Sequence, residues 1–320
     1  MIVGARLCST LLALFTTVAC FGAIATASSP VINEGTVPFV YEGETYHTYY
    51  KIFGNISTSS RSALVVLHGG PGLSHDYLLP IAELATYASV PVIFYDQIGG
   101  ARSTHLREKD PSFWSIDLFL DELMNLILHF AVQDSFDLLG HSWGGVLGAE
   151  YAVRKQPEGL KHLILSNTLA SSELWGRSTA QLMQAFPEDV QQGIIAGMVD
   201  PNRFGEAMRK FNQVHGCTVR PMPKEFMYSF EQIFGKDGDT TVASAPILQD
   251  WSIIDRLHRI RVPTLVINGG SDIAQDFVVA PFYQYVPDAR WITFENSSHT
   301  PFWEERERYL QVVGNFLALE

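Results

Sequence analysis

Cysteine is scarce in this chain of 320 residues, which contains only three cysteines. Two of them, Cys8 and Cys20, lie in an apolar N-terminal stretch, and Cys217 stands alone in the remainder of the chain. A single cysteine cannot form an internal disulfide, so a small fold held together by disulfides is excluded. The sequence offers Cys217 no evident chemical partner, and we expect it to be a buried structural thiol.

Basic residues are also few, since 22 lysines and arginines stand against 34 aspartates and glutamates. The formal net charge is −12 at pH 7, and the sequence contains no basic run. These features argue against a nucleic acid or a stable membrane partner. The histidines show no metal-ligand spacing such as His-Glu-x-x-His, so we predict neither a metal nor another cofactor.

The N-terminal segment has the layout of a secretory leader. One charged residue, Arg6, is followed by an apolar run from Leu7 to Ala25 and then by small residues. This pattern predicts a signal peptide over residues 1–27 that is cleaved before Ser28, which would make the mature protein secreted or secretory-pathway luminal. The alternative is an N-terminal membrane anchor, because the apolar run is nearly long enough to span a bilayer.

A Gly-x-Ser-x-Gly motif follows a short apolar run that begins at Phe136. The residues from Gly140 to Gly144 place Ser142 between two glycines. This pattern is typical of a tight turn from a strand into a helix, which exposes the serine hydroxyl at the end of a sheet. The motif therefore predicts Ser142 as a catalytic nucleophile.

A second apolar run, over residues 63–67, leads into a loop that begins His68-Gly69-Gly70. In this architecture, such a loop supplies one backbone N–H of an oxyanion hole, and the residue after the serine supplies the other. We therefore predict an oxyanion hole formed by the amides of Gly70 and Trp143. His68 and Gly69 are further candidates for contact with the substrate.

Two later segments provide partners for the serine in the expected chain order of serine, acid and histidine. A buried strand followed by Gly-Gly-Ser leads to Asp272, and another strand ends a few residues before His299. Polar groups at the carboxyl ends of parallel strands meet at one edge of a sheet. We predict that His299 takes the proton from Ser142 and that Asp272 orients His299, with Asp276 as a rival acid.

With these motifs the chain resembles the proline iminopeptidase (prolyl aminopeptidase) family of α/β-hydrolases, and especially its tricorn-interacting aminopeptidase-like subgroup. The matching segments are HGGPGLSHDYL, YDQIGGARS, GHSWGG, PTLVINGGSD and FENSSHTPFWEERE. The similarity covers nearly all of the chain from Gly35 to Leu319. It implies removal of an N-terminal proline or small residue from a short peptide or similar small molecule, without a metal.

The chain departs from that family in the acids that bind the substrate's amino group. In the subgroup, one acid directly follows the triad aspartate and another lies in the cap, but here Ile273 follows Asp272. Glu231, Asp237 or Asp239 could take over this role from new positions. The alternative function is an ester, amide or lactone hydrolase, or an acyl-transferring cyclase, acting on a specialised metabolite. A third interpretation is a binding protein that has lost turnover.

The order of apolar and amphipathic segments predicts an α/β-hydrolase fold, with a mostly parallel sheet and helices on both faces. A helical pattern covers residues 116–130, and a closing helix is expected over 303–319. We expect the core to comprise residues 28–170 and 251–320, with a helical cap inserted at 171–250. The expected strands are 63–68, 91–95, 136–140, 162–167, 263–268 and 290–295.

Five of the seven methionines lie in the expected cap, namely Met183, Met198, Met208, Met222 and Met227. They could form an adaptable apolar roof over the site or belong to the ordinary core between helices. In either case we expect the cap to determine the substrate.

Two segments match the pattern for N-linked glycosylation, one at Asn55 and one at Asn296. A glycan on Asn296 would crowd His299, three residues away. Asn55 is therefore the predicted acceptor.

Overall fold

The computed structural model describes residues 32–319 of the chain. The expected signal peptide, its membrane-anchor alternative, Cys8 and Cys20 all lie outside these residues. Within residues 32–319, none of the helices combines the length and the apolar character needed to cross a membrane. Cys217 is a free cysteine and is buried, as expected.

An eight-stranded sheet forms the centre of the fold, in the order β1-β2-β4-β3-β5-β6-β7-β8. The first two strands pair antiparallel with their neighbours, and all strands from β4 to β8 in this order run parallel. Each expected strand is present to within about two residues, which confirms the α/β-hydrolase fold. The strands are β1 (Ile32–Tyr41), β2 (Glu44–Phe53), β3 (Ala63–Leu67), β4 (Val92–Asp96), β5 (Phe136–His141), β6 (Leu160–Ser166), β7 (Thr264–Gly269) and β8 (Ala289–Phe294).

The hairpin of β1 and β2 was not expected from the sequence. A two-residue turn joins the two strands at Glu42 and Gly43, which both have positive φ, as a type I′ turn requires. Only alternate residues near the turn, such as Val37 and Phe39, are buried. The sequence signal for this hairpin is therefore a short alternation of buried and exposed residues beside Glu42-Gly43 rather than a continuous apolar run.

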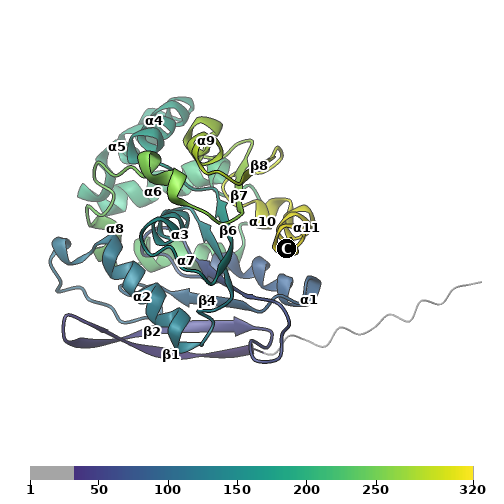
Figure 1. Ribbon diagram of the computed structural model, residues 1–320. Helices are drawn as coiled ribbons and strands as arrows, with labels where there is room; N and C mark the ends of the chain where they lie inside the picture. Colours follow the sequence, from purple (N-terminus) through teal and green to yellow (C-terminus); the bar gives the residue numbers. More distant parts are fainter. Residues whose placement is uncertain (1–31, 320) are drawn as a thin grey trace, which may run out of the picture.

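Helices cover both faces of the sheet (Figure 1). Alternate residues of β3 belong to different core clusters. The cluster of Val65 also contains residues of α2, α3 and α9, whereas the cluster of Val66 contains residues of α11 and of the helical segment that precedes α1. Burial on both faces explains why the parallel strands are apolar throughout. The expected helix at 116–130 is α2, and the closing helix is split near Glu305. These helices are α1 (Leu84–Tyr87), α2 (Ile116–His129), α3 (Trp143–Arg154), α9 (Asp276–Tyr285), α10 (Pro301–Glu304) and α11 (Arg306–Leu317).

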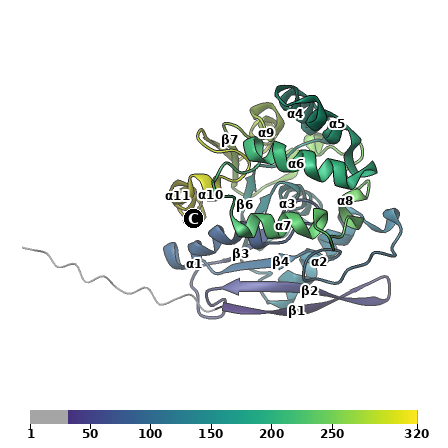
Figure 2. The same cartoon turned by 180° about the vertical axis from the view of Figure 1, so that it is seen from behind.

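The segment between β6 and β7 contains helices and no strand. An antiparallel bridge between Ser171 and Ser252 joins its two ends, next to the expected cap boundaries. Figures 1 and 2 show α4, α5 and α6 at the end of the molecule opposite to the β1–β2 hairpin. The helices of this segment, called the cap below, are α4 (Ser172–Leu182), α5 (Glu188–Ala196), α6 (Pro201–His215), α7 (Lys224–Phe234) and α8 (Thr241–Ser244).

Asn55 lies in an exposed turn after β2, where its Oδ1 accepts the backbone N–H of Ser57 at 2.9 Å. Asn296 is also exposed. Exposure is compatible with modification at either position, and glycosylation of Asn55 stays a prediction.

A buried acid, Glu122 on α2, connects the hairpin to the loop after β4. Its carboxyl group accepts hydrogen bonds from the Thr48 hydroxyl at 2.5 Å and from the Ile98 N–H at 3.0 Å. Burial raises the pKa of Glu122 to about 8. The folded protein therefore keeps a proton on Glu122 at pH values where the unfolded chain has lost it.

This raised pKa predicts that the free energy of unfolding falls as the pH rises from about 4.5 to about 8, by a few kcal/mol. Glu122→Gln should remove this part of the pH dependence, because glutamine cannot ionise. The measurement is urea unfolding at about pH 5 and about pH 9. Glu108→Gln, at an exposed position, is the control and should leave the pH dependence unchanged. An unchanged dependence in Glu122→Gln would contradict the prediction.

Candidate active site

Ser142 lies in the turn between β5 and α3, with φ 55° and ψ −122°. This conformation is strained for a residue with a side chain. A Cβ atom at Gly140 would collide with the carbonyl oxygen of Gly144, and one at Gly144 would collide with that of Leu67. The glycines of the motif are thus required by close backbone contacts on both sides of the serine.

His299 and Asp272 form a hydrogen-bonded pair, in which His299 Nδ1 lies 2.7 Å from Asp272 Oδ1. The carboxylate is buried and also accepts hydrogen bonds from the Asn167 side-chain amide at 2.6 Å and from the Ala274 N–H at 2.9 Å. A carboxylate can only accept, so Nδ1 of His299 donates and Nε2 is left free as an acceptor. This tautomer suits a general base.

The rival acid, Asp276, does not contact the histidine pair. Its Oδ1 accepts a hydrogen bond from the Asn268 side-chain amide at 2.8 Å at the start of α9. The structure therefore pairs His299 with Asp272 and gives Asp276 a separate partner.

The loop after β3 approaches the serine closely. A Cβ atom on Gly69 would lie 3.0 Å from the Cβ of Ser142, and Gly70 has a φ of 115°, which favours glycine. The N–H of Gly69 donates to the Tyr77 hydroxyl at 2.7 Å and is occupied. Trp143 is the first residue of α3, so its N–H has no acceptor within the helix. Gly70 and Trp143 are thus well suited to bind an oxyanion.

A chain of buried hydrogen bonds connects this loop to the histidine. The Tyr77 hydroxyl lies 2.7 Å from His141 Nδ1, and His141 Nε2 lies 2.7 Å from the carbonyl oxygen of His299. The carbonyl can only accept, so His141 Nε2 donates and its Nδ1 accepts from Tyr77. Burial and then the neighbouring His299 hold the pKa of His141 well below its usual value, which keeps the ring neutral. The sequence analysis assigned no role to Tyr77 or His141, although they lie in the segments HGGPGLSHDYL and GHSWGG.

Tyr77→Phe should leave the Gly69 N–H and His141 Nδ1 without a partner. We expect it to lower the free energy of unfolding by about 1–3 kcal/mol. We also expect kcat to fall about tenfold, because the oxyanion loop and His299 lose their common support. The measurements are urea unfolding and steady-state kinetics.

Tyr95→Phe is the matched control for Tyr77→Phe. The Tyr95 hydroxyl is buried and has no hydrogen-bond partner among the residues that the structure describes. Its removal should therefore leave stability and kcat nearly unchanged. Equal losses in both variants would contradict a role for the chain through Tyr77 and His141.

His68 is fully buried and does not line the site, although its loop does. Its Nε2 accepts the N–H of Gln97 at 3.0 Å, and the Gln97 side-chain amide donates to the carbonyl oxygen of His68 at 3.1 Å. Gln97 Oε1 in turn accepts from the indole of Trp143 at 2.8 Å. His68 therefore braces the loop against α3 rather than contacting a substrate directly.

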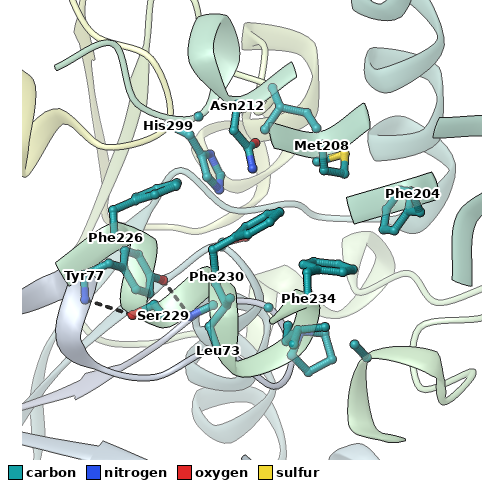
Figure 3. A pocket seen from close by; sticks show the side chains of 18 of the residues that line it. Leu73, Tyr77, Phe204, Met208, Asn212, Phe226, Ser229, Phe230, Phe234 and His299 are labelled. Carbon is teal, nitrogen blue, oxygen red and sulfur yellow. Dashed lines mark hydrogen bonds between the residues drawn. The ribbon is translucent and has the colours of Figure 1, made fainter. Parts of the chain in front are cut away.

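A cavity of about 480 Å³ lies beneath the cap and reaches Ser142 and His299. Figure 3 shows aromatic and methionine side chains around it. Among its lining residues, which all lie within residues 32–319, there is no aspartate, glutamate, lysine or arginine. Two of the five cap methionines, Met198 and Met208, are among them. Its walls include Gly69, Gly70, Leu73, Tyr77, Trp175, Phe204, Asn212, Phe226, Phe230, Ile233, Phe234 and Ile273.

None of the three acids considered for binding an amino group reaches this cavity. Glu231 and Asp237 are exposed to solvent. Asp239 is buried, but it lies 2.6 Å from His105 Nδ1 and accepts hydrogen bonds from Thr241. The expectation of a substrate contact for Glu231 thus differs from the structure, because Glu231 lies on the outer side of α7.

The segment YDQIGGARS contributes Asp96 and Arg102 to a charged cluster whose residues do not line the cavity. Asp96 accepts from His75 Nδ1 at 2.7 Å and from Arg102 at 3.2 Å, and Arg102 also binds Asp76. Burial alone would raise the pKa of Asp96, but His75 holds it at about 2. The hydrogen bond from His75 and the ion pairs of Arg102 with Asp76 and Asp96 thus hold the loop after β4 against the segment that follows β3.

Comparisons with known proteins agree with this arrangement. Residues 62–306 match the family described as alpha/beta hydrolase fold. The proline iminopeptidase of Clostridioides difficile (strain 630) is 32% identical over 300 residues, which cover 89% of this chain and 98% of that protein. The proline iminopeptidase of Saccharolobus solfataricus is 34% identical over 281 residues, with 84% and 88% covered.

Two solved structures are similar along most of the chain. The crystal structure of VinJ is 40% identical, with a TM-score of 0.81 and 90% and 98% of the two chains covered. That of the proline iminopeptidase of Mycobacterium smegmatis is 34% identical, with a TM-score of 0.76 and 89% and 97% covered. The chain is therefore an enzyme, a serine hydrolase that belongs to the proline iminopeptidase family of α/β-hydrolases.

Proposed function

We propose that this enzyme cleaves an amide bond through a triad of Ser142, His299 and Asp272 and an acyl-enzyme intermediate. The observation that carries the proposal is the 2.7 Å hydrogen bond from His299 Nδ1 to Asp272 at the wall of the cavity that also holds Ser142. It leaves Nε2 of His299 as the only ring nitrogen able to accept the serine proton.

The reaction begins when Oγ of Ser142 attacks the scissile carbonyl carbon and its proton passes to Nε2 of His299. The N–H groups of Gly70 and Trp143 bind the oxyanion that forms. The carbon–nitrogen bond then breaks as His299 returns the proton to the leaving nitrogen, and an ester remains on Ser142. Water attacks this ester and gives a proton to His299, and the acid leaves as Ser142 regains its proton.

The names of the relatives support an N-terminal proline or another small residue of a short peptide as the acyl part. The uncharged lining of the cavity favours the second candidate, which is hydrolysis or acyl transfer on a neutral ester, amide or lactone of a specialised metabolite. Burying a substrate ammonium group in this cavity without a carboxylate partner would cost several kcal/mol. This cost counts against a substrate with a free N-terminal amine.

The experiment compares wild type with Ser142→Ala on proline and alanine anilides, free and N-acetylated, and on short-chain aryl esters. Mass spectrometry of rapidly quenched wild type should detect one acyl group on Ser142. Cleavage of free proline anilide alone would establish the aminopeptidase. Ser142-dependent ester cleavage without any anilide turnover would contradict amide hydrolysis. A ligand retained without product would favour the binding protein.

A further inference from the structure

Two rows of side chains form facing walls of the cavity beneath the cap. Within each row the residues are four positions apart, so they lie on one face of their helix. Figure 3 shows both rows pointing into the space between the helices. The rows are Phe204, Met208 and Asn212 on α6, and Phe226, Phe230 and Phe234 on α7.

The two rows run in opposite directions. The rings of Phe204 and Phe234 lie 5.8 Å apart and mark the end far from the catalytic residues. At the other end Phe226 lies 6.2 Å from Tyr77, which borders the oxyanion loop. Eight helical residues span about 12 Å, so an apolar slot of about this length extends from the serine between α6 and α7.

Among residues 32–319, no aspartate or glutamate lines this slot to pair with a substrate ammonium. Two of the last carbonyl groups of α6, which carry partial negative charge, already have partners. That of Gln213 accepts from Arg220 at 2.7 Å, and that of Asn212 accepts from the backbone N–H of Cys217 at 2.7 Å. The carboxylate of Glu304 is also occupied, because it accepts hydrogen bonds from the backbone N–H of Ser298 at 2.8 Å and from that of Thr218 at 2.7 Å. The carboxylate of Asp272 is paired with the histidine of the triad.

Asn212 is the exception in the apolar rows. It sits at the catalytic end, and Figure 3 shows its amide pointing into the cavity beside His299. Among the hydrogen bonds of residues 32–319, none involves the side chain of Asn212. A carboxamide is neutral and can both donate and accept, so it matches a substrate amide rather than an ammonium.

We propose that the acyl part of the substrate is an N-acylated small residue whose own amide is bound by Asn212 and whose apolar acyl chain fills the slot between α6 and α7. This inference rests on the proposed Ser142 hydrolase but not on its aminopeptidase form. It makes the enzyme selective for substrates in which the amino group has already been blocked by an apolar acid.

The test uses three prolyl anilides, with a free amine, an N-acetyl group or an N-octanoyl group. For wild type, kcat/KM should increase in this order, with a difference of at least about tenfold between the first and the last. Asn212→Asp places a carboxylate at the same position and should reduce the ratio of N-octanoyl to free-amine turnover at least about tenfold. Gln213→Glu, which adds the same charge at the neighbouring exposed residue, is the matched control and should leave the ratio unchanged.

A second variant tests the slot itself. Met208→Trp should obstruct the middle of the slot and lower kcat/KM for the N-octanoyl substrate more than for the N-acetyl substrate. Equal effects on both substrates would overturn the placement of the acyl chain. A preference of wild type for the free amine, or an unchanged ratio in Asn212→Asp, would overturn the proposed substrate class.

Binding to Ser142→Ala, measured by calorimetry with the same anilides, keeps the inference testable without turnover. Tighter binding of the N-octanoyl compound, weakened by Met208→Trp, would support it even if wild type cleaves none of the three. In that case the proposed reaction would fail and the inference about the slot would stand. Tighter binding of the free amine would overturn the inference alone.

Discussion

Ser142→Ala is expected to lower kcat by about 10⁶-fold on every substrate that the wild type cleaves. Alanine has no Oγ to accept the acyl group, although the cavity and the amides of Gly70 and Trp143 would remain. The measurement is kcat from steady-state kinetics, calculated per mole of folded protein. Ser60→Ala, at an exposed serine, is the control and should retain full activity. Residual turnover within a hundredfold of wild type would contradict nucleophilic catalysis by Ser142.

A third variant separates the chemistry of Ser142 from its backbone strain. Ser142→Gly should be as inactive as Ser142→Ala, but its free energy of unfolding should be higher by about 1 kcal/mol, because glycine adopts a φ of 55° more readily. Urea unfolding of the two inactive variants measures this difference. Equal stability would show that the turn holds no measurable strain.

Asp272→Asn is expected to lower kcat by about 10⁴-fold. Asparagine presents an amide N–H or a neutral oxygen to His299 and no longer stabilises the protonated ring. It also loses the charge that the Asn167 amide and the Ala274 N–H hold in place. The measurement is kcat of the variant and of wild type at several pH values around 7.

Asp276→Asn is the matched control for Asp272→Asn, since it makes the same change four residues away. Its carboxylate contacts Asn268 rather than the histidine, so we expect kcat to change less than about tenfold. A larger loss in Asp276→Asn than in Asp272→Asn would reverse the assignment of the acid.

The sequence predicted the parallel part of the sheet well because those strands are buried on both faces. A strand such as β3 is apolar at every position, and Gly69 and Gly70 in the loop that follows mark its carboxyl end. The positions of Ser142, Asp272 and His299 could be predicted for the same reason, since each follows one of these strands. Their position beside one cavity then follows from parallel strands ending at one edge.

The features that sequence analysis missed depend on contacts between distant parts of the chain. The hairpin of β1 and β2 is buried on part of one face, so only a few residues carry its signal. The link from Tyr77 to His141 joins residues 64 positions apart, and no local pattern marks it. Likewise, the orientation of Glu231 depends on how α7 packs, whereas its sequence shows only an acid in the expected region.

The bridge between Ser171 and Ser252 means that the cap leaves and rejoins the sheet at a single place. The entropy of closing an insertion depends only weakly on its length once its two ends are fixed together. Cap helices can therefore be lengthened, shortened or exchanged while β6 and β7 keep their positions. An enzyme built in this way can acquire a new substrate by exchanging one contiguous stretch of its gene, while the parts that perform the reaction stay as they were.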